Sequence, residues 1–384
     1  MKFLHIADLH IGKVLHGVSL LEEQKEIFQQ ILRYVENEKP EAVIIAGDIY
    51  DKAVPQAAAV ELFDQLLTEL VSCKASVMVV AGNHDSPERL AYAARLLASR
   101  DVHLCGAYAG QIPQVVKQDA FGEVVFHLLP FVRPAMVRSF FPALSIDSHQ
   151  DAVAAILQKD GWSEQPGAVK KGRHVLVAHQ YVKGLGEEPE RSASEVIQVG
   201  GLDGVDAGLF AAFDYVALGH LHGPQSVGAA KNRYAGSPLK YSFSEYLQKK
   251  AVTMVEMGET GEVVITSLPL SPFRDLRKLR GPLTGLLQQG VQEPGREDYL
   301  HVTLTDEEEI IDPIGKLRQV FPNVLQLEID NTRTRAEGNF TLTEIREEKS
   351  LLDLFRLFYQ EQNGSPLSPE EELFVQVIDR GGDA

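Results

Sequence analysis

Carboxylate, imidazole and amide side chains occur in five short clusters along the chain. The members that could hold a metal ion are Asp8, His10, Asp48, Asn83, His179, His220 and His222. Nitrogen and oxygen ligands of this kind suit divalent first-row ions such as Mn²⁺, Fe²⁺ or Zn²⁺. The chain has only two cysteines, and this disfavours a structural zinc site built from thiolates.

Seven ligands are too many for one ion, but two ions that share a carboxylate would use all of them. Asp48 is the natural bridge, because one carboxylate can serve two ions that lie about 3.5–4 Å apart. Paired ions lower the pKa of a bridging water and neutralise the charge of a phosphate. The cluster set therefore predicts a two-metal centre for phosphate chemistry.

His84 follows Asn83 directly, and this position lets it touch a substrate rather than a metal. Asp85, the next residue, could fix the tautomer of His84 or keep its imidazole protonated. We therefore expect His84 and Asp85 to be catalytic.

The five clusters each follow a short apolar run, and these runs are typical of buried strands. Helical patterns over residues 20–36 and 56–70 separate the first strands, and Ser86 with Pro87 opens another helix. This alternation predicts βαβ units and a sheet that is covered on both faces. Since sites in such sheets form where strands end, we expect the clusters to meet. The predicted strands are residues 3–6, 42–46, 77–81, 124–129, 174–178 and 215–218, with a closing hairpin at 252–257 and 263–267.

A boundary with two prolines at residues 268–273 precedes a smaller pattern. We expect a small α+β module there and a tail of two helices. The tail helices would cover residues 343–362 and begin again at the capping box of residues 368–371. In the module, the predicted strands are 276–279, 299–304 and 324–329, and the predicted helices are 283–289 and 314–321.

The composition is that of an ordinary globular protein. Hydrophobic residues make up 44% of the chain and charged residues 24%, near the average for globular proteins. The length of 384 residues suggests two or three domains. No apolar run approaches the roughly 20 residues of a membrane span, and the first residues do not resemble a signal peptide. Cys73 and Cys105 build no disulfide framework. We expect a cytoplasmic protein.

The formal net charge is −17, whereas a protein that coats nucleic acid by charge alone should be basic. Any contact with DNA must therefore be local, helped by metal ions or shared with a partner.

The order of these clusters resembles the calcineurin-like metallophosphoesterase superfamily over about residues 1–270. Within it, three segments are similar to the bacterial SbcD nuclease subunits, and the similarity extends over the downstream module and tail. The segments are Gly82-Asn83-His84-Asp85-Ser86, Leu218-Gly219-His220-Leu221-His222 and Gly236-Ser237-Pro238-Leu239-Lys240-Tyr241-Ser242-Phe243. One local departure is Leu9, where the family pattern leads us to expect an aromatic residue; it is not a ligand position.

The resemblance implies a four-layer αββα sandwich with a small α+β capping domain and a C-terminal helical tail. The implied domains are residues 1–270 for the nuclease, 271–340 for capping and DNA binding, and 341–384 for a helix–loop–helix that binds the partner. One ion would be held by Asp8, His10, Asp48 and His222, and the other by Asp48, Asn83, His179 and His220. His84 would contact the scissile phosphate.

The implied activity is that of a Mn²⁺-dependent DNA nuclease, a 3′–5′ double-strand exonuclease and single-strand or hairpin endonuclease. It would belong to an ATP-regulated complex with an SbcC-type coiled-coil ATPase that processes DNA ends, hairpins and breaks in repair, replication and recombination. A homodimer associated with the nucleoid is part of the same expectation. A phosphomonoesterase or cyclic-nucleotide phosphodiesterase, or a scaffold that only tethers DNA ends, are the alternatives.

Two further sets of contacts are predicted. The DNA-contact set is Arg89, Arg274, Arg277, Lys278, Arg280, Arg333 and Arg335, with solvated surface cations or ordinary salt bridges as the alternative. The partner-contact set is Leu351, Leu352, Phe355, Phe358, Phe374 and Val377, docked by a helix-in-groove mode. The alternative for this acidic tail is packing back on the small module.

Overall fold

A computed structural model describes most of the chain. The described residues are 1–162, 172–184, 188–195, 204–332, 334, 355, 356, 359 and 367. They fall into two compact units, Met1–Leu304 with Ile310–Glu328, and Thr305–Glu309 with Ile329–Ala384. None of the helices in the described part has the length and apolar content that a bilayer crossing requires.

Two six-stranded sheets build the larger part of the first unit. The first has the order β16-β15-β1-β4-β5-β6, with parallel pairing from β1 to β6 and antiparallel pairing of β15 with its neighbours. Its strands are β1 (Lys2–Ile6), β4 (Ala42–Ala46), β5 (Ser76–Val80), β6 (Val102–Cys105), β15 (Ala251–Met257) and β16 (Val263–Pro269).

The second sheet has the order β13-β14-β12-β9-β8-β7, with β8, β9, β12 and β14 parallel. Its strands are β7 (Gln114–Asp119), β8 (Gly122–Leu129), β9 (Arg173–His179), β12 (Tyr215–Gly219), β13 (Gln225–Val227) and β14 (Ala229–Tyr234).

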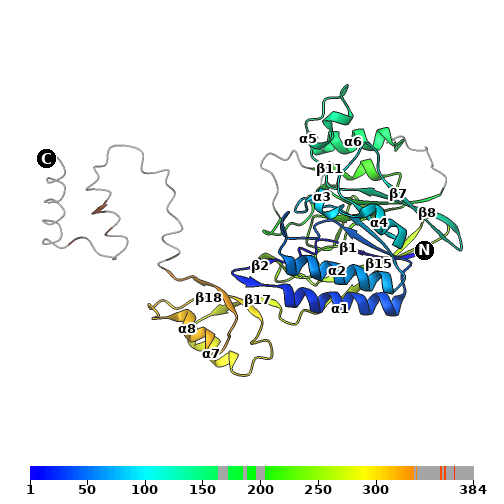
Figure 1. Ribbon diagram of the computed structural model, residues 1–384. Helices are drawn as coiled ribbons and strands as arrows, with labels where there is room; N and C mark the ends of the chain where they lie inside the picture. The colour runs from blue at the N-terminus through cyan, green and yellow to red at the C-terminus, as the bar shows by residue number, and fades with distance from the viewer. Residues whose placement is uncertain are drawn as a thin grey trace. The chain divides into compact units, whose positions relative to one another are not determined.

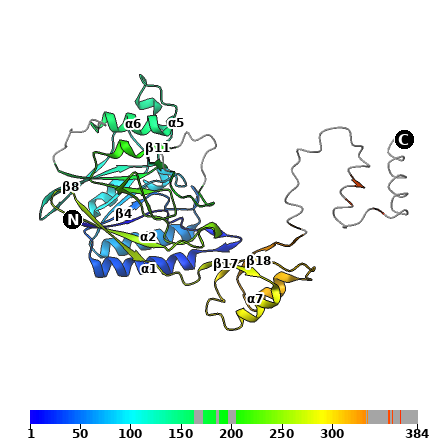
Figure 2. The ribbon, with the colours of Figure 1, turned by 180° about the vertical axis from the view of Figure 1, so that it is seen from behind.

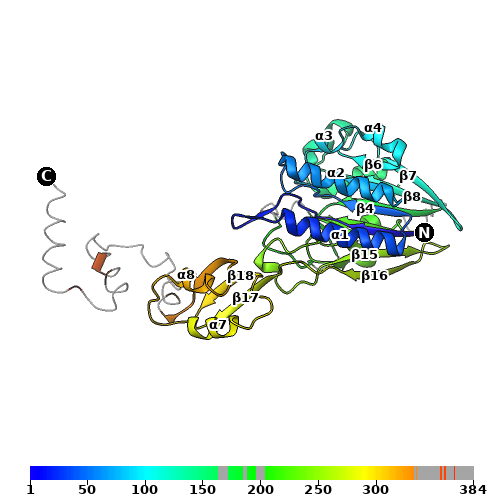
Figure 3. The same ribbon diagram turned by 60° about the horizontal axis from the view of Figure 1, so that its bottom comes forward.

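Side-chain alternation along the parallel strands separates three apolar layers. In β4, Val43 and Ile45 pack with α1 (Leu21–Glu38) and α2 (Ala57–Ser72), while Ile44 packs between the two sheets. A strand buried on both faces must be apolar at every position, and all five residues of β4 are buried. Figures 1 and 3 show α1 and α2 side by side over the outer face of the first sheet.

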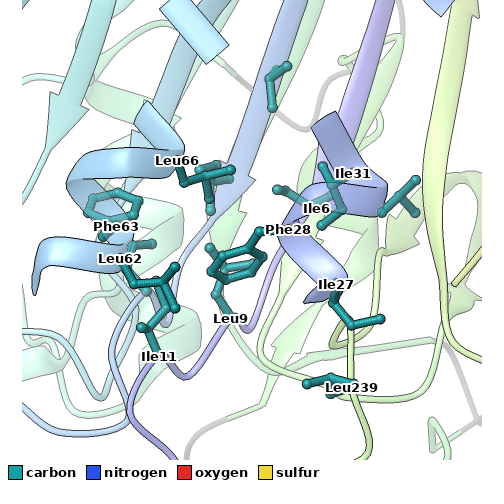
Figure 4. Packing of buried hydrophobic residues seen from close by; sticks show 14 of the residues in the cluster. Ile6, Leu9, Ile11, Ile27, Phe28, Ile31, Leu62, Phe63, Leu66 and Leu239 are labelled. Atoms are coloured by element: carbon teal, nitrogen blue, oxygen red, sulfur yellow. The ribbon is translucent and has the colours of Figure 1, made fainter. Parts of the chain in front are cut away.

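The outer face of the second sheet is covered by α6 (His149–Lys159) and η3 (Ala207–Phe210), which share an apolar cluster with β9 and β12. Figure 2 shows α6 on the side of the unit opposite α1. The prediction of a four-layer αββα sandwich is therefore confirmed. Figure 4 shows the helix-side packing, with Ile27, Phe28 and Ile31 of α1 and Leu62, Phe63 and Leu66 of α2 placed over Ile6, Leu9 and Ile11.

The small module has its own core, built on a three-stranded sheet with the order β17-β18-β19. We use this name for β17 to β19 together with Arg274 and Asp275, which precede them. Its elements are β17 (Leu276–Gly281), α7 (Leu283–Gly290), β18 (Tyr299–Leu304), α8 (Pro313–Arg318) and β19 (Val324–Ile329).

Short elements connect these layers. They are β2 (Val14–Leu15), β3 (Val18–Ser19), α3 (Pro87–Leu90), α4 (Ala94–Leu97), η1 (Ala98–Arg100), α5 (Pro134–Val137), η2 (Arg138–Phe140), β10 (Val182–Lys183), β11 (Val205–Asp206) and η4 (Phe243–Glu245).

The strands and helices predicted in the described part of the first 270 residues are all present, within about two residues at their ends. The sequence pattern did not reveal β6, β7, β14 and α6. The first three have polar side chains on a partly exposed face, so they lack the continuous apolar run of the central strands. Helix α6 begins with a capping box of Ser148 and Asp151, a signal that was present and not used. The predicted tail helices lie almost wholly outside the described residues.

Candidate metal centre

The structure brings all seven candidate ligands to one edge of the sandwich. Asp8 and His10 follow β1, Asp48 follows β4, Asn83 follows β5, His179 ends β9, and His220 and His222 follow β12. Oxygen and nitrogen atoms of five of these residues, together with His84, form overlapping groups of possible metal ligands. These groups are Asp8, His10 and His222; Asp8, Asp48 and His179; and His10, Asp48 and His84.

Asp48 lies at the middle of the cluster. Its Oδ2 is 3.7 Å from Nε2 of His10 and 3.3 Å from Nε2 of His179. Its Oδ1 accepts a hydrogen bond of 2.8 Å from the backbone N–H of His84. One carboxylate therefore faces both halves of the cluster, as a shared ligand must.

Asn83 joins the two histidines of one half. Its Oδ1 lies 3.0 Å from Nε2 of His179 and 2.9 Å from Nδ1 of His220. The Nδ1 of His179 donates to the carbonyl oxygen of Ala46 at 2.8 Å, and this leaves Nε2 as the atom for a ligand.

His10 and His222 form the other half, with their Nε2 atoms 3.2 Å apart. His222 is oriented by Glu245, whose Oε1 accepts from Nδ1 at 3.0 Å. Glu245 is fully buried and also accepts a bond of 2.7 Å from Nζ of Lys250. A buried carboxylate behind a histidine is the usual support of a metal-binding imidazole.

The electrostatics of the centre favour a cation. Burial opposes ionisation of Asp48, but the adjacent imidazoles, His179 first, hold its pKa well below the usual range. Burial likewise opposes protonation of His179, yet the Asp48 carboxylate raises the pKa of that imidazole to about 9. Burial also raises the pKa of Asp8 to about 7. A divalent ion placed among these groups would replace such protons.

The backbone that presents the ligands is held in an unusual conformation. Asp8, His10, Asp48 and His220 have φ of 53°, 42°, 49° and 108°. Non-glycine residues adopt positive φ at a cost of about 1–3 kcal/mol each, and they keep it only where the surroundings enforce it. Gly82 allows the close approach, because a Cβ there would lie 2.1 Å from Oδ1 of Asp48.

His84 is half-buried, and its ring centroid lies 4.8 Å from that of His10. Its Nδ1 lies 2.9 Å from the carbonyl oxygen of Asp51. A carbonyl can only accept, so Nδ1 carries a proton and Nε2 is the atom left for a substrate.

The expectation that Asp85 sets the tautomer of His84 is wrong. The carboxylate of Asp85 accepts from the backbone N–H groups of Ile49, Tyr50 and Gly82 at 3.1, 3.0 and 2.8 Å. It therefore ties the loop after β4 to the loop after β5, and the backbone of Asp51 takes the orienting position.

Sequence reasoning also missed the residues that support the ligands. Gln24 in α1 is fully buried and donates to the carbonyl oxygens of Leu9 and His10 at 3.1 and 2.8 Å. Glu245 and Lys250 have no motif that marks them. Tyr241 belongs to a segment that resembles the SbcD subunits, but nothing in the sequence marks its hydrogen bond to the carbonyl oxygen of Leu9.

The predicted DNA-contact residues do not form one free basic patch. Arg274 pairs with Glu23 at 2.5 Å, and Arg277 pairs with Glu293 and Asp298 at 3.0 and 2.7 Å. These contacts support the ordinary salt-bridge alternative for both. Of the remaining set, Arg89, Lys278 and Arg280 are exposed, while Arg333 and Arg335 lie outside the described residues.

Of the predicted partner contacts, only Phe355 is described. Its side chain is 42% exposed, and its ring lies 6.4 Å from that of Tyr359. Leu351, Leu352, Phe358, Phe374 and Val377 lie outside the described residues.

Two family models match parts of the chain. Residues 1–224 match the family described as calcineurin-like phosphoesterase. Residues 272–363 match the family SbcD_C, described as type 5 capsule protein repressor C-terminal domain.

Among curated proteins, the chain is 31% identical over 388 residues to the SbcD subunit of the nuclease SbcCD from Staphylococcus epidermidis, and the match covers 100% of both chains. Among solved structures, it is similar to a dimetal phosphatase from Danio rerio, with a TM-score of 0.38, 13% identity, and coverage of 70% of this chain and 96% of the other. It is also similar to Yfce, a phosphoesterase from E. coli, with a TM-score of 0.28, 12% identity, and coverage of 71% and 100%.

Proposed function

Because the chain belongs to the calcineurin-like phosphoesterase family and to its SbcD nuclease subunits, we propose that it is a Mn²⁺-dependent DNA nuclease. Membership of the family implies a metal-dependent phosphodiesterase activity. The choice of Mn²⁺ and of DNA ends and hairpins as substrates, with 3′–5′ polarity, is the proposal. The observation that carries it is the meeting of seven candidate ligand side chains, Asp48 at their middle, with His84 beside them.

The donor set fits two divalent ions. Asp8, His10 and His222 would hold one ion, Asn83, His179 and His220 the other, and Asp48 would serve both. Carboxylate, imidazole and amide ligands suit Mn²⁺. When bound, such ions neutralise phosphate charge and supply an activated water.

The chain's own residues position the reaction. The Asp51 carbonyl oxygen holds Nδ1 of His84, so Nε2 can orient or protonate the leaving 3′ oxygen. The bond from the His84 backbone to Asp48 fixes this ring relative to the shared ligand. Asp85 keeps the two ligand loops together through backbone N–H groups.

The assembly is part of the proposal. The Staphylococcus epidermidis relative is named as one subunit of an SbcCD nuclease, which supports a complex with an SbcC-type coiled-coil ATPase. A homodimer through helices of the first half is also part of the proposal. Exposed apolar side chains are present on that half, and among them Val60 in α2, Tyr92 and Leu96 are 45%, 82% and 76% exposed. We keep residues 1–270 as the nuclease domain, 271–340 as the capping domain and 341–384 as the partner-binding tail.

Cleavage of a 3′-labelled linear duplex by the purified chain tests the proposed function. We expect degradation with Mn²⁺, none with EDTA, and recovery when Mn²⁺ is added back, because bound ions would activate the attacking water. Mg²⁺ and Zn²⁺ are run in parallel. A chromogenic phosphodiester separates the alternative, since hydrolysis of this ester without any DNA cleavage, even with the ATPase partner present, would indicate a small-ester phosphatase.

Glu245→Gln tests how His222 is held. The variant removes the charge behind Nδ1, so we expect the affinity for one Mn²⁺ ion to fall about 10–100-fold. Isothermal titration with Mn²⁺ measures this, and Glu256→Gln, an exposed position in β15, is the matched control. Equal affinity in Glu245→Gln and Glu256→Gln would show that Glu245 does not support a ligand.

A further inference from the structure

Two pairs of consecutive residues connect the small module to the loop that carries Asp8 and His10. One pair is Glu23 and Gln24 in α1, and the other is Lys240 and Tyr241 in the loop before η4. In each pair, one side chain contacts the small module and its neighbour contacts the ligand loop.

In the first pair, Glu23 faces the small module. Its Oε1 accepts from Nη1 of Arg274 at 2.5 Å and from the hydroxyl of Tyr299 at 2.7 Å. Gln24 faces the ligand loop, where its Nε2 donates to the carbonyl oxygens of Leu9 and His10. Its Oε1 accepts from the backbone N–H of Gly12 at 3.0 Å. Glu23 and Gln24 are 3% and 0% exposed, so the side chains of this pair are shielded from water, while the Arg274 side chain is partly exposed.

In the second pair, Nζ of Lys240 lies 2.8 and 2.9 Å from the two carboxylate oxygens of Asp275. The hydroxyl of Tyr241 donates to the carbonyl oxygen of Leu9. It also accepts from Nε2 of Gln24 at 3.2 Å, which joins the two pairs.

Both connections end on the ligands of one proposed ion. The Tyr241 ring lies 5.4 Å from the His10 ring and 5.8 Å from the His222 ring. Leu9, between Asp8 and His10, is fully buried and packs beneath α1, as Figure 4 shows. Since Asp8 and His10 both have positive φ, their backbone depends on such outside contacts.

We propose that Glu23–Gln24 and Lys240–Tyr241 are positioning residues that couple the small module to the ion held by Asp8, His10 and His222. The inference rests on the proposed two-ion site and adds how one of its halves is controlled. A DNA end or protein partner that displaces the small module would change the affinity of the centre for this ion. Because such coupling is reciprocal, binding of the ion would in turn stabilise the position of the small module.

Arg274→Met tests the coupling at a position that touches no proposed ligand. Isothermal titration of the full chain with Mn²⁺ should show one of two ions bound about 2- to 30-fold more weakly, a typical coupling effect. The other ion should bind as in the wild type. In an Asn83→Ala background, where the remaining ion is expected at Asp8, His10 and His222, Arg274→Met should still weaken binding.

Arg277→Met is the matched control, because it breaks ion pairs that lie within the small module. It should leave both affinities unchanged. An equal loss of affinity for both ions, or the same loss of affinity in Arg274→Met and Arg277→Met, would indicate a general destabilisation of the fold. Either result would overturn the inference. Unchanged binding in Arg274→Met would overturn it as well.

Gln24→Met supplies a second test through a double-mutant cycle. If both residues act through one connection, the double variant with Arg274→Met should lose no more affinity than Gln24→Met alone. Additive losses would overturn the coupling. The proposed function fails separately: a wild-type chain that binds no Mn²⁺ would remove the two-ion site itself.

Discussion

Asp48→Asn is expected to abolish DNA cleavage and to remove most of the bound metal. Asp48 is the carboxylate that faces His10 and His179 at once, so its charge serves both halves of the centre. Asparagine keeps the shape but presents one neutral oxygen, and the amide group points a donor at the remaining site. We expect the cleavage rate to fall by at least about 10²–10³-fold, as when a group that stabilises transition-state charge is lost.

The measurement pairs Mn²⁺ titration with cleavage of a labelled duplex. Asp64→Asn, at an exposed position of α2, is the control for an equal change in charge. The thermal midpoint of unfolding is recorded for both variants, because Asp48 also accepts the backbone N–H of His84. Wild-type cleavage by Asp48→Asn would show that Asp48 is not the shared ligand.

The candidate ligands could be predicted from the sequence because each stands at the end of a strand or within a few residues after it. Val43 and Ile45 must face helices and Ile44 must face a second sheet, so the run around them contains no polar residue until Asp48. The parallel pairing of β1, β4 and β5 then brings their ends together. The residue types of the candidate ligands and the strands that precede them are both visible within short stretches of the sequence.

The supporting residues could not be found in this way. Gln24 lies within a helix whose pattern is that of an ordinary amphipathic one, and Glu245 lies 23 residues from the histidine that it orients. Their roles follow from contacts that form only when distant segments pack. Asp85 shows the opposite error, since it stands next to His84 in the sequence but points to the backbone of another loop.

The net negative charge of the chain bears on how it would bind DNA. With a net charge of −17 and with Arg274 and Arg277 occupied by carboxylates, the described surface offers DNA little general attraction. The two proposed ions would then supply much of the positive charge that the scissile phosphate meets. On this view, binding of DNA by the chain alone should be weak and sensitive to salt.

His84→Ala is expected to separate metal binding from catalysis. The ring is half-buried beside His10, and the Asp51 carbonyl oxygen occupies its Nδ1, so Nε2 would be the atom that serves the substrate. Alanine leaves Asp48 its bond from the backbone N–H of residue 84. We therefore expect both Mn²⁺ ions to bind, while cleavage of duplex DNA falls by about 10²–10⁴-fold, the usual worth of a positioned acid or base.

His103→Ala in β6 is the matched control, because that imidazole pairs with Asp101 rather than with the centre. It should bind metal and cleave DNA as the wild type does. The decisive comparison is between the two readouts of His84→Ala. Loss of metal together with activity would make His84 a ligand, since it also stands within reach of His10 and Asp48. If His84→Ala binds metal but does not cleave DNA, His84 acts on the leaving oxygen. If the variant keeps both metal binding and cleavage, His84 has no role in the reaction.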